Sequence, residues 1–270
     1  MKIGNRVFDT ENHTYVMGIL NVTPDSFSDG GKWNDYDQAM SHVEKMIKEG
    51  ADIIDIGGES TRPGHIQISA EEECERTAPV IEAVKKNFDI PVSIDTYKSY
   101  VAEAALKAGA DLVNDIWGFL YDDKMAGLVK EYGASCCLMH NRKSPVYEDF
   151  LEDMCNDLQK CITAAKNAGI EDDKIMLDPG VGFGKTYEMN LYVMKNLEVF
   201  QKFGYPVLLG TSRKSMIGLA LDLPVEEREE GTLVTTVMAV QNRYGFVRVH
   251  DVEKNVRAIR MAEIIRNASV

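Results

Sequence analysis

The chain has 270 residues, of which 44% are apolar and 27% charged, as in an ordinary globular protein. Its formal net charge of −13 argues against a nucleic acid partner and requires any anion site to be a local concentration of basic residues. No apolar run approaches the about 18 residues of a membrane span, and the first residues lack a signal-peptide core, so we expect a cytoplasmic protein.

Short apolar, β-rich runs alternate with longer helical patterns along the chain. Strands are predicted at 15–22, 51–58, 91–96, 110–116, 134–140, 174–180, 206–212 and 245–250. Helices are predicted near 35–49, 69–87, 98–108, 122–132, 148–168, 187–203, 225–243 and 252–267. Ser69 with Glu72 forms a capping-box pattern. Glycines end several helices directly before the next strand: Gly50, Gly109, Gly133 and Gly169.

Strict alternation of strands and helices with short connections indicates a parallel sheet. Eight repeats predict one α/β domain over 1–270, a (β/α)8 TIM barrel; a doubly wound open sheet is the alternative. The opening stretch "KIGNRVFDTENHTYV" predicts a β-hairpin that turns at Glu11–Asn12 and plugs the N-terminal end of the barrel.

The five cysteines form no C-x-x-C pair, so a metal-thiolate site and a disulfide framework are both weak interpretations. We expect Cys136 and Cys137, which lie in an apolar run, to be reduced core residues.

Two loops are long and rich in turn residues, 21–35 after the first strand and 57–69 after the second. Loops of this length in a barrel are usually functional, so we expect lids over a site. Phe27 lies in an otherwise polar stretch, which suggests that its ring covers a ligand.

Polar side chains stand at the carboxyl end of almost every predicted strand, where barrels of this kind carry their active sites. They are Asn21, Asp95, Asn114, Asp115, His140, Asp178, Ser212, Arg213, Lys214, Arg248 and His250. One Asp or Asn could be a helix cap, but the whole set indicates a site. Residues two apart share a strand face, so Arg248 and His250 are expected to point to the same rim.

This predicted site has two chemical characters. Asp95, Asn114 and Asp178 are rich in acceptors and suit a flat heterocycle with N–H groups. The second character is basic and suits an anion; it comes from Arg62, Arg213, Lys214, Arg248 and His250.

The stretch "LDPGVGFGKTYE" resembles a phosphate-binding P-loop but has the wrong spacing, because Pro179 stands where the first glycine is required. We expect its glycines to let the backbone turn sharply beside the site and to present Phe183 as an apolar wall. Lys185 is expected to be exposed to solvent.

Seven motifs in order, from Met17 to Val252, resemble the dihydropteroate synthase family. They are "MGILNVTPDSFSDGG", "DIIDIGGESTRPG", "VSIDT", "LVNDI", "DPGVGFGKT", "GTSRKSMIG" and "RVHDV". The resemblance implies a (β/α)8 barrel that joins 6-hydroxymethyl-7,8-dihydropterin diphosphate to p-aminobenzoate with Mg2+ as cofactor. It also implies a homodimer formed by later helices, with neither nucleic acid nor membrane as a partner.

The resemblance also implies roles for individual residues. Asp95, Lys214 and Asn21 would be catalytic, with Asn21 also on Mg2+. The pterin would contact Asp95, Asn114, Asp178, Lys214, Met139, Phe183 and Arg248. The diphosphate would contact Asn21, Thr61, Arg62, Arg248 and His250. The p-aminobenzoate would contact Phe27, Pro63, Phe183, Lys214 and Ser215.

Two other functions stay open from the sequence. A methyltetrahydrofolate–corrinoid methyltransferase would share the acceptor set, but we expect it to lack the "NVTPDSF" and "SRK" stretches. A pterin-binding paralogue without catalysis would be expected to have lost Asn21, Arg62 or Lys214, all of which are present.

Overall fold

The computed structural model describes residues 1–22, 32–59 and 67–269, with the backbone alone for 32–35. In these residues eight parallel strands form one sheet: β3 (Tyr15–Asn21), β4 (Ile53–Gly57), β5 (Val92–Asp95), β6 (Leu112–Asp115), β7 (Ser135–Met139), β8 (Ile175–Asp178), β9 (Leu208–Leu209) and β10 (Phe246–Val249). A bridge between Leu177 and Val207 closes the sheet. The predicted (β/α)8 barrel is confirmed, and the open-sheet alternative is wrong.

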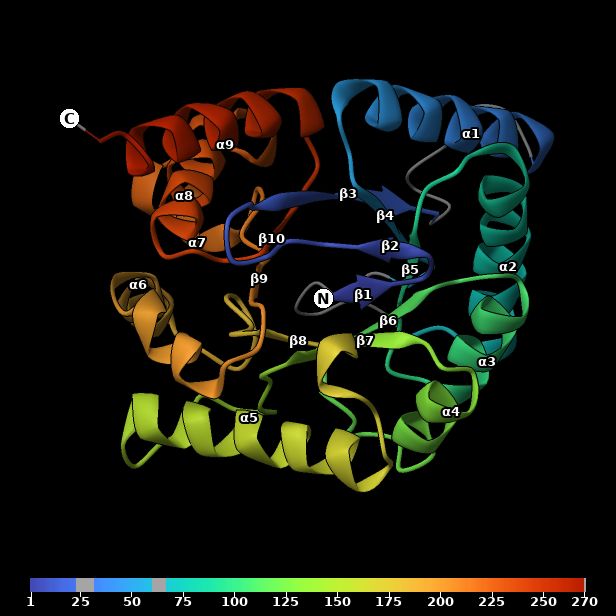
Figure 1. Ribbon diagram of the computed structural model, residues 1–270, viewed down its shortest axis with the longest axis horizontal. Coiled ribbons are helices and arrows are strands. Elements are labelled where there is room, and N and C mark those ends of the chain that lie inside the picture. Colours follow the sequence, from blue (N-terminus) through green and yellow to red (C-terminus); the bar gives the residue numbers. More distant parts are fainter. Residues whose placement is uncertain (23–31, 60–66, 270) are drawn as a thin grey trace.

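Helices surround the strands as a ring (Figure 1). They are α1 (Lys32–Glu49), α2 (Ala70–Asn87), α3 (Ser99–Lys107), α4 (Met125–Glu131), α5 (Phe150–Asn167), α6 (Tyr187–Lys195), α7 (Ser215–Leu221), α8 (Glu229–Gln241) and α9 (Val252–Arg266). The predicted N-cap of α2 is present, since the Ser69 hydroxyl accepts the Glu72 N–H at 3.1 Å. No helix in the described part of the chain is long and apolar enough to cross a membrane.

Two predicted helices are shorter in the structure, and one helix was not predicted. The helix predicted over 187–203 ends its α-form at Lys195 and continues as a 3-10 helix, Leu197–Phe203. The helix predicted over 225–243 begins at Glu229. Helix α7 was not predicted, because seven residues with Gly218 inside give too little periodicity to detect.

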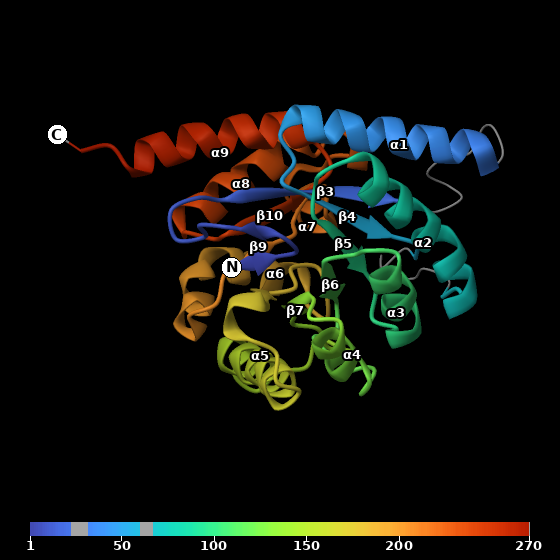
Figure 2. The same ribbon diagram turned by 45° about the vertical axis from the view of Figure 1, so that its right-hand side comes forward.

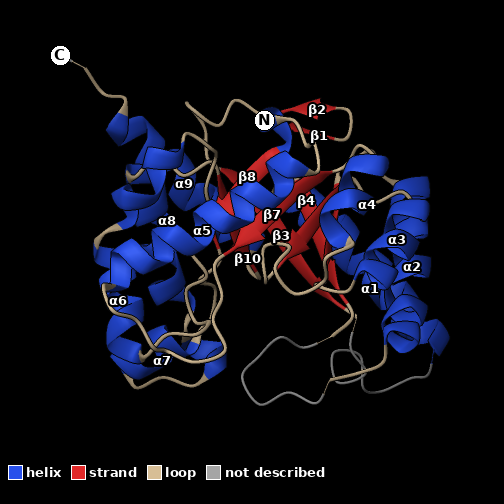
Figure 3. Cartoon of the chain, turned by 90° about the horizontal axis from the view of Figure 1, so that it is seen from below, coloured by secondary structure: helices blue, strands red, loops and turns tan. Residues whose placement is uncertain are grey.

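The N-terminal hairpin closes the bottom of the barrel, its amino-terminal end, which is drawn at the top in Figure 3. It pairs β1 (Lys2–Ile3) with β2 (Arg6–Val7), so its turn lies between them and not at Glu11–Asn12, as predicted. Gly4 makes this tight turn possible, since its φ of +57° is in the left-handed region. The predicted plug is confirmed: Ile3 and Phe8 are buried against inward side chains of the barrel, namely Met17, Ile53, Leu112, Cys137, Met176, Leu208 and Phe246.

The larger part of the core lies between the outer face of the barrel and the helices. Cys136 lies in this outer core and Cys137 in the barrel interior. Both are buried and form no disulfide, as expected, and burial raises the pKa of both thiols. The barrel is therefore packed throughout its lower half, which leaves the carboxyl ends of the strands for a site.

Candidate active site

A polar layer lies directly above the apolar bottom of the barrel. Residues two apart on a strand face the same side, so the residue two positions after each apolar inward residue also faces the barrel interior. These positions hold Ile19, Asp55, Asp95, Asn114, Met139, Asp178, Gly210 and Arg248. The acceptors and the arginine that the sequence predicted for one pocket therefore share one layer.

Arg248 joins two of the carboxylates in this layer. Its Nε donates to Asp55 Oδ2 at 2.6 Å and its Nη2 donates to Asp95 Oδ2 at 2.7 Å. Burial alone would lower the pKa of Arg248, but Asp55 and Asp95 raise it above its ordinary value. The guanidinium is therefore charged and held in place by the barrel interior.

Asp55 is a residue that the sequence analysis missed. It is fully buried, and the Asn114 amide lies 3.5 Å from its Oδ2, on the same oxygen that accepts from Arg248. The signal was an acidic residue inside the apolar strand "IIDIG" at the inward-facing parity. A buried carboxylate needs a charged partner, and Arg248 supplies it.

Asp95 and Asp178 face the barrel interior, and both can accept further hydrogen bonds. Asp95 Oδ1 is buried and has no hydrogen-bond partner in the described residues. Burial raises the pKa of Asp95 to about 7, against the opposing effect of Arg248. Asp178 Oδ1 accepts the Gly180 N–H at 2.7 Å, and burial raises the pKa of this carboxyl as well.

Lys214 supplies a cation above this layer. Its Nζ donates to the Val181 carbonyl and lies 4.6 Å from the centre of the Phe183 ring. Burial lowers the pKa of Lys214 to about 8, although Asp178 opposes the shift. Ser215 follows as the exposed first residue of α7.

Glycines leave room between these groups. A Cβ on Gly57 would lie 3.6 Å from Asn21 Oδ1 and 3.8 Å from Asp95 Oδ2, so Asn21 and Asp95 border the same space. A Cβ on Gly210 would lie 3.5 Å from Asp178 Oδ2. Larger side chains at these two positions would fill the space between the polar groups.

One side of the mouth is apolar. Met139 packs with Tyr97 and Ile116, and Phe183 is half-buried against this cluster. The predicted apolar wall at Phe183 is therefore present beside Lys214. A flat ring could lie between this wall and the carboxylates.

The basic residues predicted for an anion site separate in the structure. His250 lies half-buried at the end of β10, with its Nδ1 2.9 Å from Ser212 Oγ. Arg213 instead forms a two-pronged ion pair with Asp251, at 2.7 and 3.0 Å from its Nη2. In the described residues Arg213 is thus bound to the residue that directly precedes α9, whereas Arg248 lies in the polar layer of the barrel.

Two of the strand-end polar residues point out of the barrel. Asp115 accepts the backbone N–H groups of Trp117 and Phe119, at 2.8 and 3.0 Å, and so shapes the turn after β6. His140 is fully buried outside the barrel, with Nε2 3.4 Å from Asp157 Oδ2. The expectation that strand-end polar groups converge on one rim is wrong for these two.

The turn after β8 has the sharp shape that its glycines predicted. Gly180, Gly182 and Gly184 have φ values of +66°, +90° and +56°. A Cβ on Gly180 would lie 1.9 Å from the His140 carbonyl oxygen, so this position tolerates no side chain. The prediction that Lys185 is exposed to solvent is wrong: it is half-buried and reaches under the turn to the Gly180 and Phe183 carbonyls, at 2.8 and 2.9 Å.

Four predicted site residues, Phe27, Thr61, Arg62 and Pro63, lie outside the described residues, as does most of both predicted lids. The residues bordering 60–66 form a network that the sequence analysis also missed. Lys98 Nζ donates to Glu59 Oε2 at 2.6 Å, to Glu73 Oε2 at 2.8 Å and to the Ile68 carbonyl at 2.9 Å. This network fixes the end of β4 to the start of α2.

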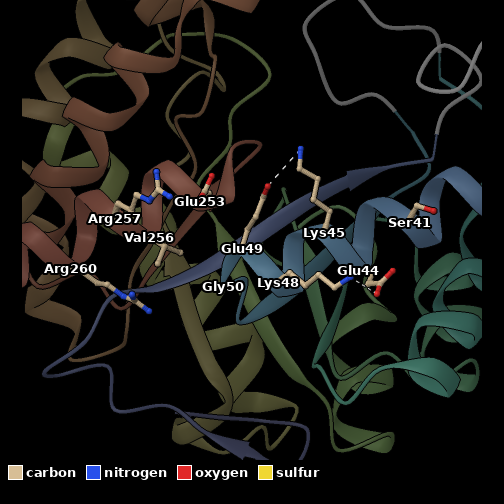
Figure 4. A pocket seen from close by; sticks show the side chains of 10 residues that line it. All are labelled: Ser41, Glu44, Lys45, Lys48, Glu49, Gly50, Glu253, Val256, Arg257 and Arg260. Carbon is tan, nitrogen blue, oxygen red and sulfur yellow. Dashed lines mark hydrogen bonds and ion pairs between the residues drawn. The ribbon is translucent and has the colours of Figure 1, made fainter.

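A groove of about 570 Å³ lies away from the mouth, between α1 and α9 (Figure 4). Its lysines pair within their own helix, Lys48 with Glu44 at 2.6 Å and Lys45 with Glu49 at 3.6 Å. No converging set of unpaired polar groups is therefore found among these lysines and glutamates, and the chemistry lies at the barrel mouth.

Comparisons with known proteins agree with this location. The family model described as pterin binding enzyme matches residues 17–250. A dihydropteroate synthase of Clostridium beijerinckii is 61% identical over 266 residues, which cover 98% of this chain and 99% of that protein.

Solved structures give the same result. The crystal structure of a dihydropteroate synthase from Clostridium difficile, obtained in the presence of pteroic acid, is 49% identical with a TM-score of 0.95, and the match covers 97% of this chain and 100% of that one. The Xanthomonas albilineans dihydropteroate synthase with 4-aminobenzoic acid is 38% identical with a TM-score of 0.91, covering 96% and 95%.

Proposed function

Since the chain belongs to the family of pterin-binding enzymes and has the activity of a dihydropteroate synthase, a transferase of folate biosynthesis, we propose that its barrel mouth binds both substrates of that reaction. The observation that carries the proposal is the buried, unpartnered Asp95 Oδ1 beside Asp178 and Asn114. Buried acceptors of this kind call for N–H donors, and the pterin ring supplies them.

The pterin occupies the space beside Gly57 and Gly210. Asp95 and Asp178 accept its N–H groups, while Asn114 and Lys214 donate to its acceptors. Met139 and Phe183 cover the ring, and Arg248 lies at its edge while holding Asp95 in place. The related structure obtained with pteroic acid supports this class of ligand.

The reaction breaks the bond between the pterin methylene carbon and the diphosphate oxygen, and the diphosphate leaves with the electron pair. The positive charge left on the methylene is delocalised into the ring, where ionised Asp95 stabilises it. The amine of p-aminobenzoate then forms the carbon–nitrogen bond and releases one proton. A dissociative displacement suits this weak nucleophile because the electrophile is formed first.

Diphosphate is proposed to bind above the pterin, at Asn21, His250 and Arg248 together with Thr61 and Arg62. Mg2+ would neutralise part of the diphosphate charge. Asn21 fits such an ion, because its amide oxygen borders the space next to Asp95. The described residues hold no group of three His, Cys, Asp or Glu that could form a metal site of their own. A Mg2+ that arrives with the substrate phosphates needs few protein ligands.

The p-aminobenzoate is proposed to lie at the outer end of the site, against Phe183, Lys214 and Ser215, with Phe27 and Pro63 from the two loops. The Lys214 ammonium, placed over the Phe183 ring, can pair with the carboxylate of this substrate. The related structure with 4-aminobenzoic acid supports this class of ligand.

A homodimer and a cytoplasmic location complete the proposal. Exposed apolar side chains gather on the last three helices: Leu219, Leu221, Val234, Met261, Ile264 and Ile265. Exposed apolar side chains gathered on neighbouring helices are typical of an interface. All five cysteines are unpaired, as in proteins of a reducing compartment.

Diphosphate release from the pterin diphosphate, measured with and without p-aminobenzoate, tests the proposal. Release that depends on p-aminobenzoate, and that stops with a Mg2+ chelator and returns with added Mg2+, is the expected result. Methyl transfer from methyltetrahydrofolate without any diphosphate release would identify the corrinoid methyltransferase alternative. Pterin binding without turnover would identify the non-catalytic alternative.

A further inference from the structure

Lys185 is partly buried beneath the turn from Gly180 to Gly184, and the proposed reaction does not use it. Its Nζ donates to the Gly180 carbonyl at 2.8 Å and to the Phe183 carbonyl at 2.9 Å. It also lies 2.9 Å from His140 Nδ1. An ammonium has three N–H donors, so these three acceptors match it.

Other side chains also hold the same turn. The Lys214 ammonium donates to the Val181 carbonyl, the Tyr147 hydroxyl donates to the Gly184 carbonyl at 2.8 Å, and the Gly182 N–H donates to Asn190 Oδ1 at 2.6 Å. Lys185 differs from these contacts because it joins the beginning of the turn to its end. It therefore constrains the backbone that carries Phe183.

His140 connects this clamp to helix α5. If Nδ1 accepts from the Lys185 ammonium, the ring proton lies on Nε2, which is 3.4 Å from Asp157 Oδ2 but makes no hydrogen bond within the described residues. Asp157 in turn accepts from Arg142 Nε at 2.6 Å. Burial lowers the pKa of His140 to about 4, which keeps the ring neutral and able to accept.

The charges around Lys185 come from several elements. Asp178 on β8 and Asp157 on α5 favour the ammonium, whereas Lys214 and Arg142 oppose it. Burial, the largest effect, lowers the pKa of Lys185 to about 7. The three acceptors at Nζ are best satisfied by the charged form.

We propose that Lys185 is a positioning residue that fixes the turn from Gly180 to Gly184 and so holds the Phe183 ring against Lys214, where the substrates bind. The kinetic part of this inference rests on the role proposed above for Phe183. A neutral side chain cannot replace the lysine, because the two carbonyls and the imidazole need three donors at one point. Lys185 touches no reacting atom and acts through the backbone.

Hydrogen exchange tests the structural part. The Phe183 N–H closes the turn onto the Gly180 carbonyl at 3.1 Å, so its exchange rate reports whether the turn is intact. In Lys185→Met, which keeps the aliphatic stem and removes the donors, we expect this amide to exchange at least about tenfold faster. Lys185→Gln, which keeps two donors, should lie between this variant and the parent protein, and it decides the question if the Met variant does not fold.

Lys174→Met is the matched control. Lys174 also donates to a backbone carbonyl, that of Gly133, at 2.9 Å, but it lies at the opposite end of the barrel. This variant should leave Phe183 exchange unchanged. An unchanged exchange rate in folded variants at Lys185 would overturn the positioning role.

A double-mutant cycle tests the kinetic part. Lys185→Met and Phe183→Ala should each raise the KM for p-aminobenzoate by about tenfold, and the double variant should show little further increase. Fully additive effects would overturn the claim that Lys185 acts through Phe183. If Phe183→Ala alone leaves every KM unchanged, the proposed role of Phe183 fails, while hydrogen exchange still decides the role of Lys185.

Discussion

Arg248 balances the charges inside the barrel. It donates to Asp95 Oδ2, while Asp95 Oδ1 has no partner among the described residues and is available to the substrate. Asp55, which is fully buried, holds the second edge of the same guanidinium. The arginine is thus aligned by two carboxylates before any ligand binds. Binding of the pterin then requires little rearrangement of the charged groups beneath it.

The ionisation of Asp95 should be visible in the pH dependence of catalysis. Its pKa is raised to about 7, so the carboxylate that stabilises the cation forms as the pH rises through about 7. The pKa of Lys214, lowered to about 8, sets a second limb, where its charge is lost as the pH rises further. We expect kcat/KM for the pterin substrate to follow a bell-shaped curve with limbs near these values.

Replacing Asp95 by Asn should remove the limb near pH 7 and lower turnover by about 10²–10³-fold, because the volume is kept and the charge is lost. Steady-state kinetics across the pH range, with circular dichroism as the folding control, would measure both effects. A limb near pH 7 that persists in this variant would reject Asp95 as its origin.

Truncating Arg248 should destabilise the protein strongly. Arg248→Ala leaves two buried carboxylates without their partner, and breaking a buried ion pair in this way costs about 3–5 kcal/mol. Urea unfolding would measure the loss. Arg257→Ala is the control, since its pair with Glu253 is exposed and contributes about 0.5 kcal/mol or less.

Adding Asp55→Asn to the Arg248→Ala variant should recover part of this stability, because one of the two stranded charges is removed. If the double variant is no more stable than Arg248→Ala alone, the charge explanation is wrong.

At the scale of elements, the two ends of the barrel have separate tasks. The N-terminal hairpin seals the bottom with Ile3 and Phe8, and the carboxyl ends of the strands carry the polar layer. This separation means that stability and activity should respond to different substitutions.

Ile3→Ala should lower the free energy of unfolding by about 2–5 kcal/mol, because Ile3 is fully buried in the plug. Its kcat should stay near the parent value, since the active site lies at the other end. Val7→Ala on the same hairpin, where Val7 is 80% exposed, should change stability by about 0.5 kcal/mol or less. Thermal unfolding and kinetics of both variants provide the measurement, and equal stability of the two would show that the plug contributes nothing.

At the scale of the whole molecule, the ring of helices is uneven. Helices α9 and α1 follow one another along one edge and meet there (Figure 2), and α8 packs closely against α9. The exposed apolar residues of α7, α8 and α9 lie on this later part of the ring. A partner copy would cover them while leaving the barrel mouth open.

Val234→Glu should therefore convert the proposed dimer to a monomer without unfolding it, since Val234 is 61% exposed on α8. Val146→Glu is the control, because Val146 is 70% exposed but lies in the loop after β7. Sedimentation equilibrium would separate the two species. If Val234→Glu is still a dimer, the proposed interface on α8 is wrong. Dissociation with Val146→Glu instead would place the interface near the loop after β7.

The sequence by itself determined the barrel and most of the polar layer. Strand order, strand number and the inward parity of Asp95, Asn114, Asp178 and Arg248 follow from local patterns, because alternation and helical periodicity are set by neighbouring residues. The carboxyl ends of parallel strands meet at one face, so strand-end polar residues could be assigned to a common site.

The tertiary structure alone decided which groups pair. Asp55 with Arg248 and Lys185 with His140 join segments 193 and 45 residues apart, and no local pattern contains such distances. The same applies to Arg213, whose charge is balanced by Asp251 at the start of α9. Burial and ion pairing depend on what the folded chain brings together, and so the charge state of a site residue is a property of the fold rather than of its motif.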